Sequence, residues 1–236
     1  PAVNGTVNAV TSDGSGGWFV GGTFATVGTA TAANLVHLTP SGQLDATWLP
    51  SPDGAVDALA LSSDHSKLYV GGAFATIGGQ TRNGLACLTA STGAPTAWNP
   101  NANNTVSEVA LSPNQSTLYV AGTFTSVGGQ TRAVRSAFDF SAGSATSWHP
   151  APAAAVSTLQ VSADNSTVYA GGSFANIGGQ ARSSIAALSA STGLASAFAP
   201  QANGPVTAIR LSPDGTLLYV GGTFSAVGSA VRTDLG

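Results

Sequence analysis

The sequence predicts an all-β chain, a β-propeller of four-stranded antiparallel blades of about 50 residues each. Three observations lead to this prediction. One motif recurs five times at a constant spacing, the composition lacks most strong helix formers, and the expected strands are apolar on both faces.

The repeat is clearest in an apolar run that ends in a pair of glycines. Residues 68–74 read Leu-Tyr-Val-Gly-Gly-Ala-Phe in the second copy. The second glycine of this run recurs every 50 residues, at Gly22, Gly72, Gly122, Gly172 and Gly222. Five copies in register indicate a single propeller domain or propeller segment. The expected blades are residues 1–49, 50–99, 100–149, 150–199 and 200–236, the last of them incomplete.

Within the second repeat, turn signals separate four expected strands. They are Asp57–Ser62, Lys67–Phe74, Gly84–Thr89 and Ala94–Trp98. The first and third are apolar at nearly every position, as in sheets that are covered on both faces by neighbouring sheets. Their many alanines and glycines let sheets approach closely. A β-solenoid is the main rival, since a helical solenoid would need a period of 3.6 residues.

The composition excludes several classes of protein. The chain has 30 Gly, 12 Pro, no Met and a single Lys, and only 7% of its residues are charged. Long helices are disfavoured by this composition, and the 43% hydrophobic content argues against a disordered chain. Seven scattered cations do not build a nucleic-acid-binding surface, and no run of 18 apolar residues predicts a membrane span. No cofactor is expected.

The landmarks of the repeat resemble a known family. In the second copy, the glycine pair is followed by Phe-Ala-Thr-Ile-Gly-Gly-Gln-x-Arg, then by Thr-Gly, Trp-x-Pro and Gly-x-Val. This order is similar to the delta-60 repeat, a bacterial β-propeller repeat of undefined function in secreted and surface proteins, over nearly the whole chain. Kelch repeats share the glycine pair and a later Trp. The resemblance implies a propeller in an extracellular or cell-surface setting and brings no catalytic residues.

The two ends of the sequence fall at different points of the repeat. Pro1 aligns with Pro50, at a blade boundary, whereas residues 232–236 align with residues 82–86, midway into a third strand. We therefore expect that the natural protein continues beyond residue 236, or that another chain completes the open edge as a homo-oligomer.

Polar residues gather in two kinds of loop that should share one face. Alternate connections of an antiparallel sheet lie on opposite sides, so the loop between the second and third strands and the connection between blades lie together. The candidate binding residues there are Gln80, Arg82, Gln130, Arg132, Gln180, Arg182, Asn101, Asn103, Gln201 and Asn203. They suit hydrogen bonding to a glycan or a protein edge. The alternative, which we favour, is that each Gln and Arg binds carbonyls of its own loop.

Two other repeating features admit a functional and a structural reading. Trp48, Trp98 and Trp148 could stack on sugars, but Phe198 takes the same slot, which favours a core role. The acids in the turns after the first strand, such as Asp13 and its equivalent in the second repeat, suit Asx turns before ligands. No calcium-loop motif occurs, and no metal site is expected.

Little in the sequence supports catalysis. Acids outside turns are few and do not repeat. A glycosidase needs two carboxylates a defined distance apart, and only folding could bring two of these scattered acids together. His37, His65 and His149 have no metal-ligand spacing. Cys87 is alone and takes a slot that alanine fills elsewhere, so a filler role is expected.

Three functional hypotheses follow. The first is a non-catalytic extracellular binding, adhesion or scaffold module whose partner is a glycan or surface protein. The second is a self-assembling structural subunit of a filament or surface layer, joined through the open last blade. The third and least favoured is a hydrolase or lyase acting on polysaccharide.

Overall fold

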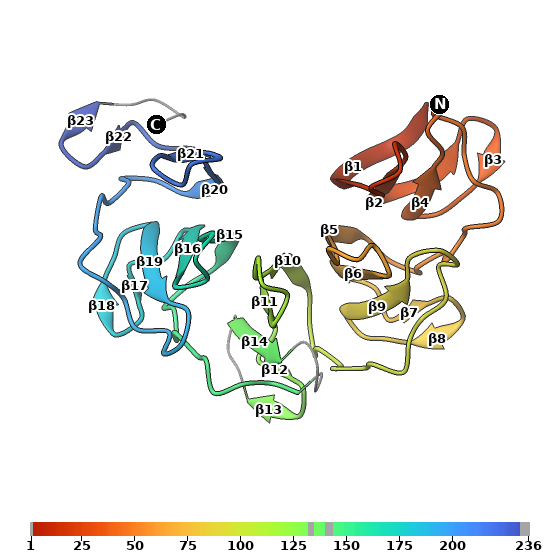
Figure 1. The fold of residues 1–236 in the computed structure, drawn as a ribbon. Coiled ribbons are helices and arrows are strands. Elements are labelled where there is room, and N and C mark those ends of the chain that lie inside the picture. The colour runs from red at the N-terminus through yellow and green to blue at the C-terminus, as the bar shows by residue number, and fades with distance from the viewer. Residues whose placement is uncertain (1, 132–134, 140–143, 232–236) are drawn as a thin grey trace. The chain divides into compact units, whose positions relative to one another are not determined.

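The computed structural model describes residues 2–131, 135–139 and 144–231, and every regular element in them is a β-strand (Figure 1). The chain divides into two compact units, Pro1–Val109 with Ser126–Gly129, and Ala110–Thr125 with Gln130–Gly236. The all-β propeller repeat predicted from the sequence is confirmed.

The first repeat forms one antiparallel sheet in the first unit. Strand β1 (Val3–Ser12) pairs with β2 (Trp18–Val27). Strand β2 also pairs with β3 (Ala30–Thr31) and β4 (Leu35–Leu38). In this register Val7 lies opposite Gly22 and Val10 opposite Val20.

The second repeat shows the predicted order of its first three strands. The sheet consists of β5 (Val56–Leu61), β6 (Lys67–Gly72) and β9 (Leu85–Thr89), all antiparallel. A small hairpin of β7 (Thr76–Ile77) and β8 (Gln80–Thr81) lies in the loop between β6 and β9. Both residues of its turn, Gly78 and Gly79, have positive φ, at 56° and 72°. Residues other than glycine disfavour these angles, so the Gly-Gly pair favours this tight hairpin turn.

The predicted fourth strand is reduced to a single bridge. Leu88 pairs with Pro95, and the same isolated bridge joins Leu188 to Ala195 in the fourth repeat. Proline has no N–H to donate to a ladder, and the backbone N–H of Thr96 bonds the carbonyl of Cys87 at 2.8 Å. The last segment of the second repeat is therefore held by few backbone hydrogen bonds.

The remaining strands follow the same plan. In the third repeat, β11 (Thr117–Gly122) pairs with β14 (Arg135–Asp139) in the second unit. The fourth repeat has β15 (Val156–Val161), β16 (Thr167–Gly172) and β19 (Ile185–Ser189), with the hairpin β17 (Asn176–Ile177) and β18 (Gln180–Ala181). The fifth has β20 (Val206–Leu211) paired with β21 (Leu218–Gly222), and the hairpin β22 (Ala226–Val227) and β23 (Ala230–Val231). Strands β10 (Val106–Leu111), β12 (Ser126–Val127) and β13 (Gln130–Thr131) complete the third repeat.

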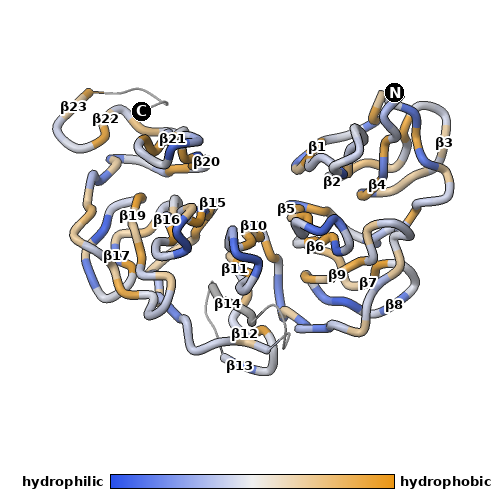
Figure 2. The backbone as a smooth tube through the Cα atoms, in the orientation of Figure 1, coloured by the Kyte–Doolittle hydropathy of each residue, from blue (hydrophilic) through white to orange (hydrophobic). Residues whose placement is uncertain are grey.

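Neighbouring repeats pack by placing apolar side chains of one first strand against a glycine of the preceding second strand. In the first unit, Val56 and Leu59 pack at Gly21, where an added methyl group would overlap Val56. In the second unit, a methyl group at Gly171 would lie 2.7 Å from Val206. The sheets thus approach more closely than a side chain would permit, as the small residues of the repeat predicted. Figure 2 shows hydrophobic residues along the strands and hydrophilic ones in the turns that join the first two strands of a repeat.

The tryptophans of the first and third repeats pack between their own repeat and the next. Trp48 is 2% exposed and belongs to a core with Phe19 of its own repeat and Leu68 of the second. Its indole N–H donates to the carbonyl of Ala90 at 2.7 Å. Trp148 is equally buried, so the predicted core role is confirmed for these two residues.

Candidate functional site

Two grooves recur at repeat-equivalent positions, one in each unit. The first has a volume of about 370 Å³ and lies where the second repeat meets the connection to the third. The second has a volume of about 290 Å³ and lies at the corresponding place after the fourth repeat. The first is lined by Gly72–Ala75, Asn83, Gly84 and Ala102–Thr105, and the second by Ser173–Ala175, Ser183, Ser184 and Asn203–Pro205. Every lining position of the second groove is 100 residues after one of the first.

Asx side chains hold one wall of each groove in place. The side-chain oxygen of Asn103 accepts a hydrogen bond from the backbone N–H of Ser126 at 2.9 Å. Asn203 accepts from the N–H groups of Ser225 and Ala226, at 2.9 and 3.0 Å. The two kinds of loop predicted to share a face are therefore in contact, and Asn103 and Asn203 fix that contact.

The equivalent place in the first repeat is occupied by a side chain. Asn34 takes the slot of Gly84 and Ser184, and all three have positive φ, at 61°, 65° and 63°. Its side-chain oxygen accepts from the N–H of Phe24 at 3.1 Å, and its amide nitrogen donates to the carbonyl of Pro52 at 3.0 Å. Asn34 thus spans the walls that Gly84 and Ser184 leave apart.

The candidate arginines that the structure describes are bound within their own repeats. Arg82 is 8% exposed and donates to the carbonyls of Thr81 and Thr96, at 2.8 and 2.7 Å, and to the side chain of Gln80. Arg182 donates to the carbonyl of Ala181 at 2.7 Å and to that of Ser196. These contacts are the ones that the structural alternative predicts, and they engage both terminal nitrogens of each guanidinium group.

The other candidate residues are exposed. Gln130, Gln180 and Gln201 lie on the surface without a place in either groove lining, and Asn101 accepts a hydrogen bond from the side chain of Asn83 at 2.6 Å. Asn101 and Gln201 both have a φ of 53°, in the residue after a proline. Arg132 lies outside the described residues.

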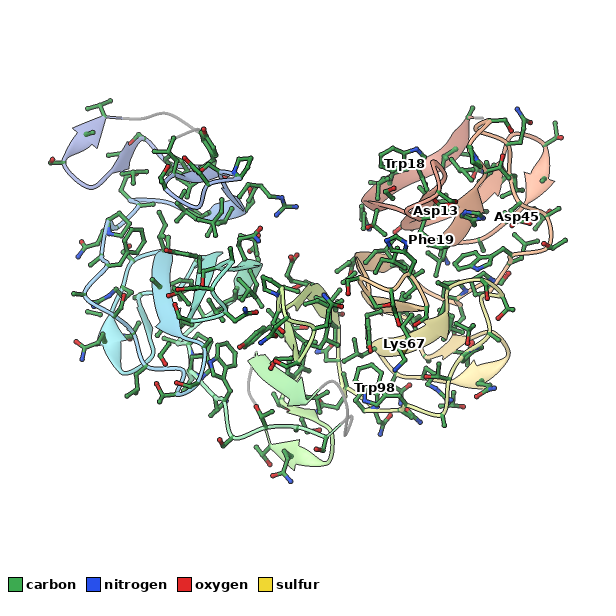
Figure 3. All side chains as sticks on the ribbon, viewed as in Figure 1. Asp13, Trp18, Phe19, Asp45, Lys67 and Trp98 are labelled. Atoms are coloured by element: carbon green, nitrogen blue, oxygen red, sulfur yellow. The ribbon has the colours of Figure 1, made fainter. Side chains whose placement is uncertain are left out.

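A polar cluster in the first repeat escaped the sequence analysis. His37 contacts two carboxylates, with Nε2 at 3.0 Å from Asp13 Oδ2 and Nδ1 at 3.1 Å from Asp45 Oδ2. His37 takes the slot of Cys87, and Asp45 that of Pro95, so both are peculiar to this repeat. The sequence did hold a signal for this cluster, because His37 and Asp45 are polar residues at repeat positions that are apolar in the second copy. Figure 3 shows Asp13 and Asp45 together in this repeat, beside Phe19.

Hydrogen bonds hold both carboxyl groups of this cluster in the ionised form. Burial acts to raise the pKa of Asp13, but hydrogen bonds from Ser15, from His37 and from the backbone outweigh it and bring the pKa well below its ordinary value. Hydrogen bonds from Thr47 and then from His37 lower the pKa of Asp45.

The cluster lacks the geometry of a nucleophilic or metal site. It borders a cavity of about 220 Å³ with Phe19 and Trp48, yet the two carboxylates lie against opposite nitrogens of one ring. A hydrolytic triad needs a hydroxyl or thiol at one of those nitrogens. No group of three or more His, Cys, Asp and Glu side chains in the described part of the chain could hold a metal ion. The arrangement instead ties β4 and the segment after it to the first turn.

The turn acid Asp64 and the lone Cys87, also considered in the sequence, both lie in environments that fit structural roles. In the turn after β5, the hydroxyl of Ser62 and then the backbone N–H of Ser66 lower the pKa of Asp64 to about 2, as expected of an Asx turn. Cys87 is 2% exposed, and burial raises the pKa of its thiol. The described residues contain no helix of the length and apolarity that crossing a bilayer requires.

The repeated sheets and the grooves between them define a β-propeller repeat protein. A family model described as "Domain of unknown function (DUF5122) beta-propeller" matches residues 12–47 and 66–94, in the first two repeats. No curated protein matches the chain.

Proposed function

We propose that this protein is a non-catalytic extracellular binding module, and that its ligand is a neutral glycan bound in the junction grooves. The observation that carries the proposal is the recurrence of one groove at two equivalent junctions, with Asn103 and Asn203 in the same place in both. Packing between repeats does not by itself need an open groove, because in the first repeat the side chain of Asn34 fills the equivalent place.

The lining of the grooves favours an uncharged ligand. Neither lining contains Asp, Glu, Lys, Arg or His. The nearest candidate cations, Arg82 and Arg182, donate to carbonyls of their own repeats. An acidic polysaccharide would find no countercharge in the grooves, whereas hydroxyl groups would find backbone and amide partners.

The size and polarity of the grooves fit a sugar unit. Volumes of about 370 and 290 Å³ lie at the lower end of those that hold small ligands. Asn83 donates its amide nitrogen to Asn101, and its side-chain oxygen has no partner in the part of the chain that the structure describes. Because Asn83 lines the first groove, that oxygen can accept a hydrogen bond from a hydroxyl group of the ligand.

We also assign the repeat to the delta-60 type, which places the protein in a bacterial, secreted or cell-surface setting. The support is the run Phe-Ala-Thr-Ile-Gly-Gly-Gln-x-Arg at residues 74–82 and its recurrence at 50-residue spacing. The single Lys and the many small hydroxyl side chains suit an exported chain. A signal peptide in the encoded precursor would test this setting, and its absence would contradict it.

The binding proposal is tested on a glycan array and by calorimetry with neutral and acidic cell-wall polymers. We expect binding to neutral glycans and none to polyuronates of the same length. The contradicting result is either no binding at all or binding that weakens steeply with added salt, because the latter would indicate an electrostatic site.

A groove-filling variant separates the grooves from the rest of the surface. Ser184→Asn places at the second groove the residue that spans the first repeat, at a φ that asparagine tolerates. Together with Gly84→Asn, whose Cβ would lie 2.8 Å from the backbone oxygen of Asn104 and so displaces that wall of the first groove, it should reduce glycan affinity by about ten-fold or more, the loss that about 1.4 kcal/mol produces.

The control is Ser184→Gly, which gives the second groove the residue found in the first. It should leave affinity unchanged. Equal binding by the filled and control variants, with unchanged circular dichroism, would place the ligand elsewhere and refute the groove as its site.

A further inference from the structure

The side chain of Asn34 in the first repeat joins two backbone groups that point toward one another. Its carboxamide oxygen accepts from the N–H of Phe24 at 3.1 Å, and its nitrogen donates to the carbonyl of Pro52 at 3.0 Å. One backbone group is a donor and the other an acceptor, and they lie at the spacing of a single amide group. This part of the first repeat is therefore complementary to a carboxamide.

The first groove has the same two backbone groups without the carboxamide. Phe74 and Ala102 take the slots of Phe24 and Pro52, and both line this groove. In the part of the chain that the structure describes, neither the N–H of Phe74 nor the carbonyl of Ala102 has a hydrogen-bond partner. Backbone polar groups in residues as buried as these, which are 3% and 1% exposed, are normally paired. The unpaired donor and acceptor mark a place for a ligand.

The second groove differs at the acceptor. There the hydroxyl of Ser183 donates to the carbonyl of Ala202 at 2.9 Å. In the first groove Asn83 takes the slot of Ser183, and its amide donates instead to the side chain of Asn101 at 2.6 Å. The backbone is alike in the two places, because the carbonyls of Asn83 and Ser183 accept from the next repeat at 3.0 and 3.1 Å. Of the two grooves, the first alone keeps this acceptor available.

We propose that the first groove binds the acetamido group of an N-acetylated amino sugar, an inference that rests on the proposed binding of a neutral glycan. The acetamido oxygen accepts from the N–H of Phe74, and its N–H donates to the carbonyl of Ala102, as the carboxamide of Asn34 does in the first repeat. A hydroxyl group donates and accepts through one oxygen and does not span two groups placed for an amide. Ala73 and Ala75, exposed in the same lining, offer apolar contact to the acetyl methyl group.

Paired oligosaccharides test this assignment on the wild-type chain. Oligomers of N-acetylglucosamine and glucose, and of N-acetylgalactosamine and galactose, are uncharged and, at matched linkage, differ within a pair in the acetamido group. Calorimetry should give a dissociation constant about ten-fold lower for the acetamido member of a bound pair, the gain that two hydrogen bonds between neutral groups produce.

The outcomes separate this inference from the proposed function. Equal affinities within every pair would overturn the acetamido site and leave the binding of neutral glycans standing. Absence of binding to any neutral glycan would contradict both. A glutamine-containing peptide that binds while no acetamido sugar does would overturn the sugar as ligand.

Substitutions of Asn83 test the acceptor itself. Asn83→Ser puts a hydroxyl group in the slot of Ser183, where it should donate to the carbonyl of Ala102 and remove the preference for the acetamido sugar. Asn83→Ala is the matched control, because it removes the same side chain and leaves that carbonyl available. It should keep the ratio of the two affinities.

Two results would overturn the role of this carbonyl. One is a preference that survives Asn83→Ser at full size, and the other is an equal loss of preference in both variants. Nuclear magnetic resonance tests the donor, since the amide proton of Phe74 should shift downfield with the acetamido sugar and not with its hydroxyl counterpart. An amide signal that responds alike to both sugars would exclude Phe74 as the donor and overturn the proposal.

Discussion

Trp48→Ala lowers the free energy of unfolding of the first unit by about 3–5 kcal/mol, the usual cost of removing a large buried aromatic side chain. Trp48 is 2% exposed, and its ring lies 4.9 Å from that of Phe19. The indole also donates to the carbonyl of Ala90 at 2.7 Å, which the variant leaves buried without this donor. This stability is lost because Trp48 packs between the first and second repeats.

Denaturant titration followed by circular dichroism measures this loss, with Trp48→Phe as control. Phenylalanine keeps most of the apolar contact and loses the hydrogen bond, so we expect about 1–3 kcal/mol. Phe198 shows that the repeat accepts the exchange, although it is 39% exposed. A loss below about 1 kcal/mol for Trp48→Ala would be far under the range for such a site and would contradict its core role.

His37→Ala lowers the free energy of unfolding by about 2–3 kcal/mol, because the contacts of its ring with two carboxylates are lost. The side chains of Asp13 and His37 are only 8% and 16% exposed, so Asp13 keeps its charge with little water to replace the imidazole. Cys87→Ala, in the equivalent slot of the second repeat, is the matched control and should cost less than His37→Ala. Equal losses would mean that the contacts of His37 with Asp13 and Asp45 contribute nothing to stability.

The contribution of Asp45 depends on pH in a defined direction. Its pKa in the folded protein is lowered below its ordinary value, so folding favours the carboxylate. The stabilisation is complete above the unfolded pKa of about 4 and is lost as the pH falls through the folded pKa. The difference in unfolding free energy between wild type and Asp45→Asn should therefore be largest at neutral pH and shrink below about pH 4. A difference that grows on acidification would contradict this sign.

Features that repeat could be predicted from the sequence, because the same pattern occurs at equivalent positions of several repeats and supports the same interpretation in each. The first three strands of the second repeat were expected within two residues of β5, β6 and β9. The core role of Trp48 followed from the slot it shares with Phe198. The hairpin of β7 and β8 was missed, although its Gly-Gly turn was a sufficient signal.

Features that occur once could not be predicted in this way. His37, Asp13 and Asp45 are separated by 24 and 8 positions in the chain, and only the pairing of β2 with β4 brings them together. The candidate list included Asn103 and Asn203 but neither Gly84 nor Ser184, because a groove depends on where side chains are small as much as on where polar ones lie.

The sequence by itself determined the repeat, its period and its first three strands, since spacing and backbone preference are local properties that recur in every copy. Only the tertiary structure decided which polar groups are committed and which surfaces stay open. Arg82 and Arg182 have the sequence context of binding residues, yet each binds a carbonyl that lies 14 positions further along the chain. Whether Val7 and Val10 are core or surface depends on a neighbouring sheet, and no residue within the strand itself specifies that neighbour.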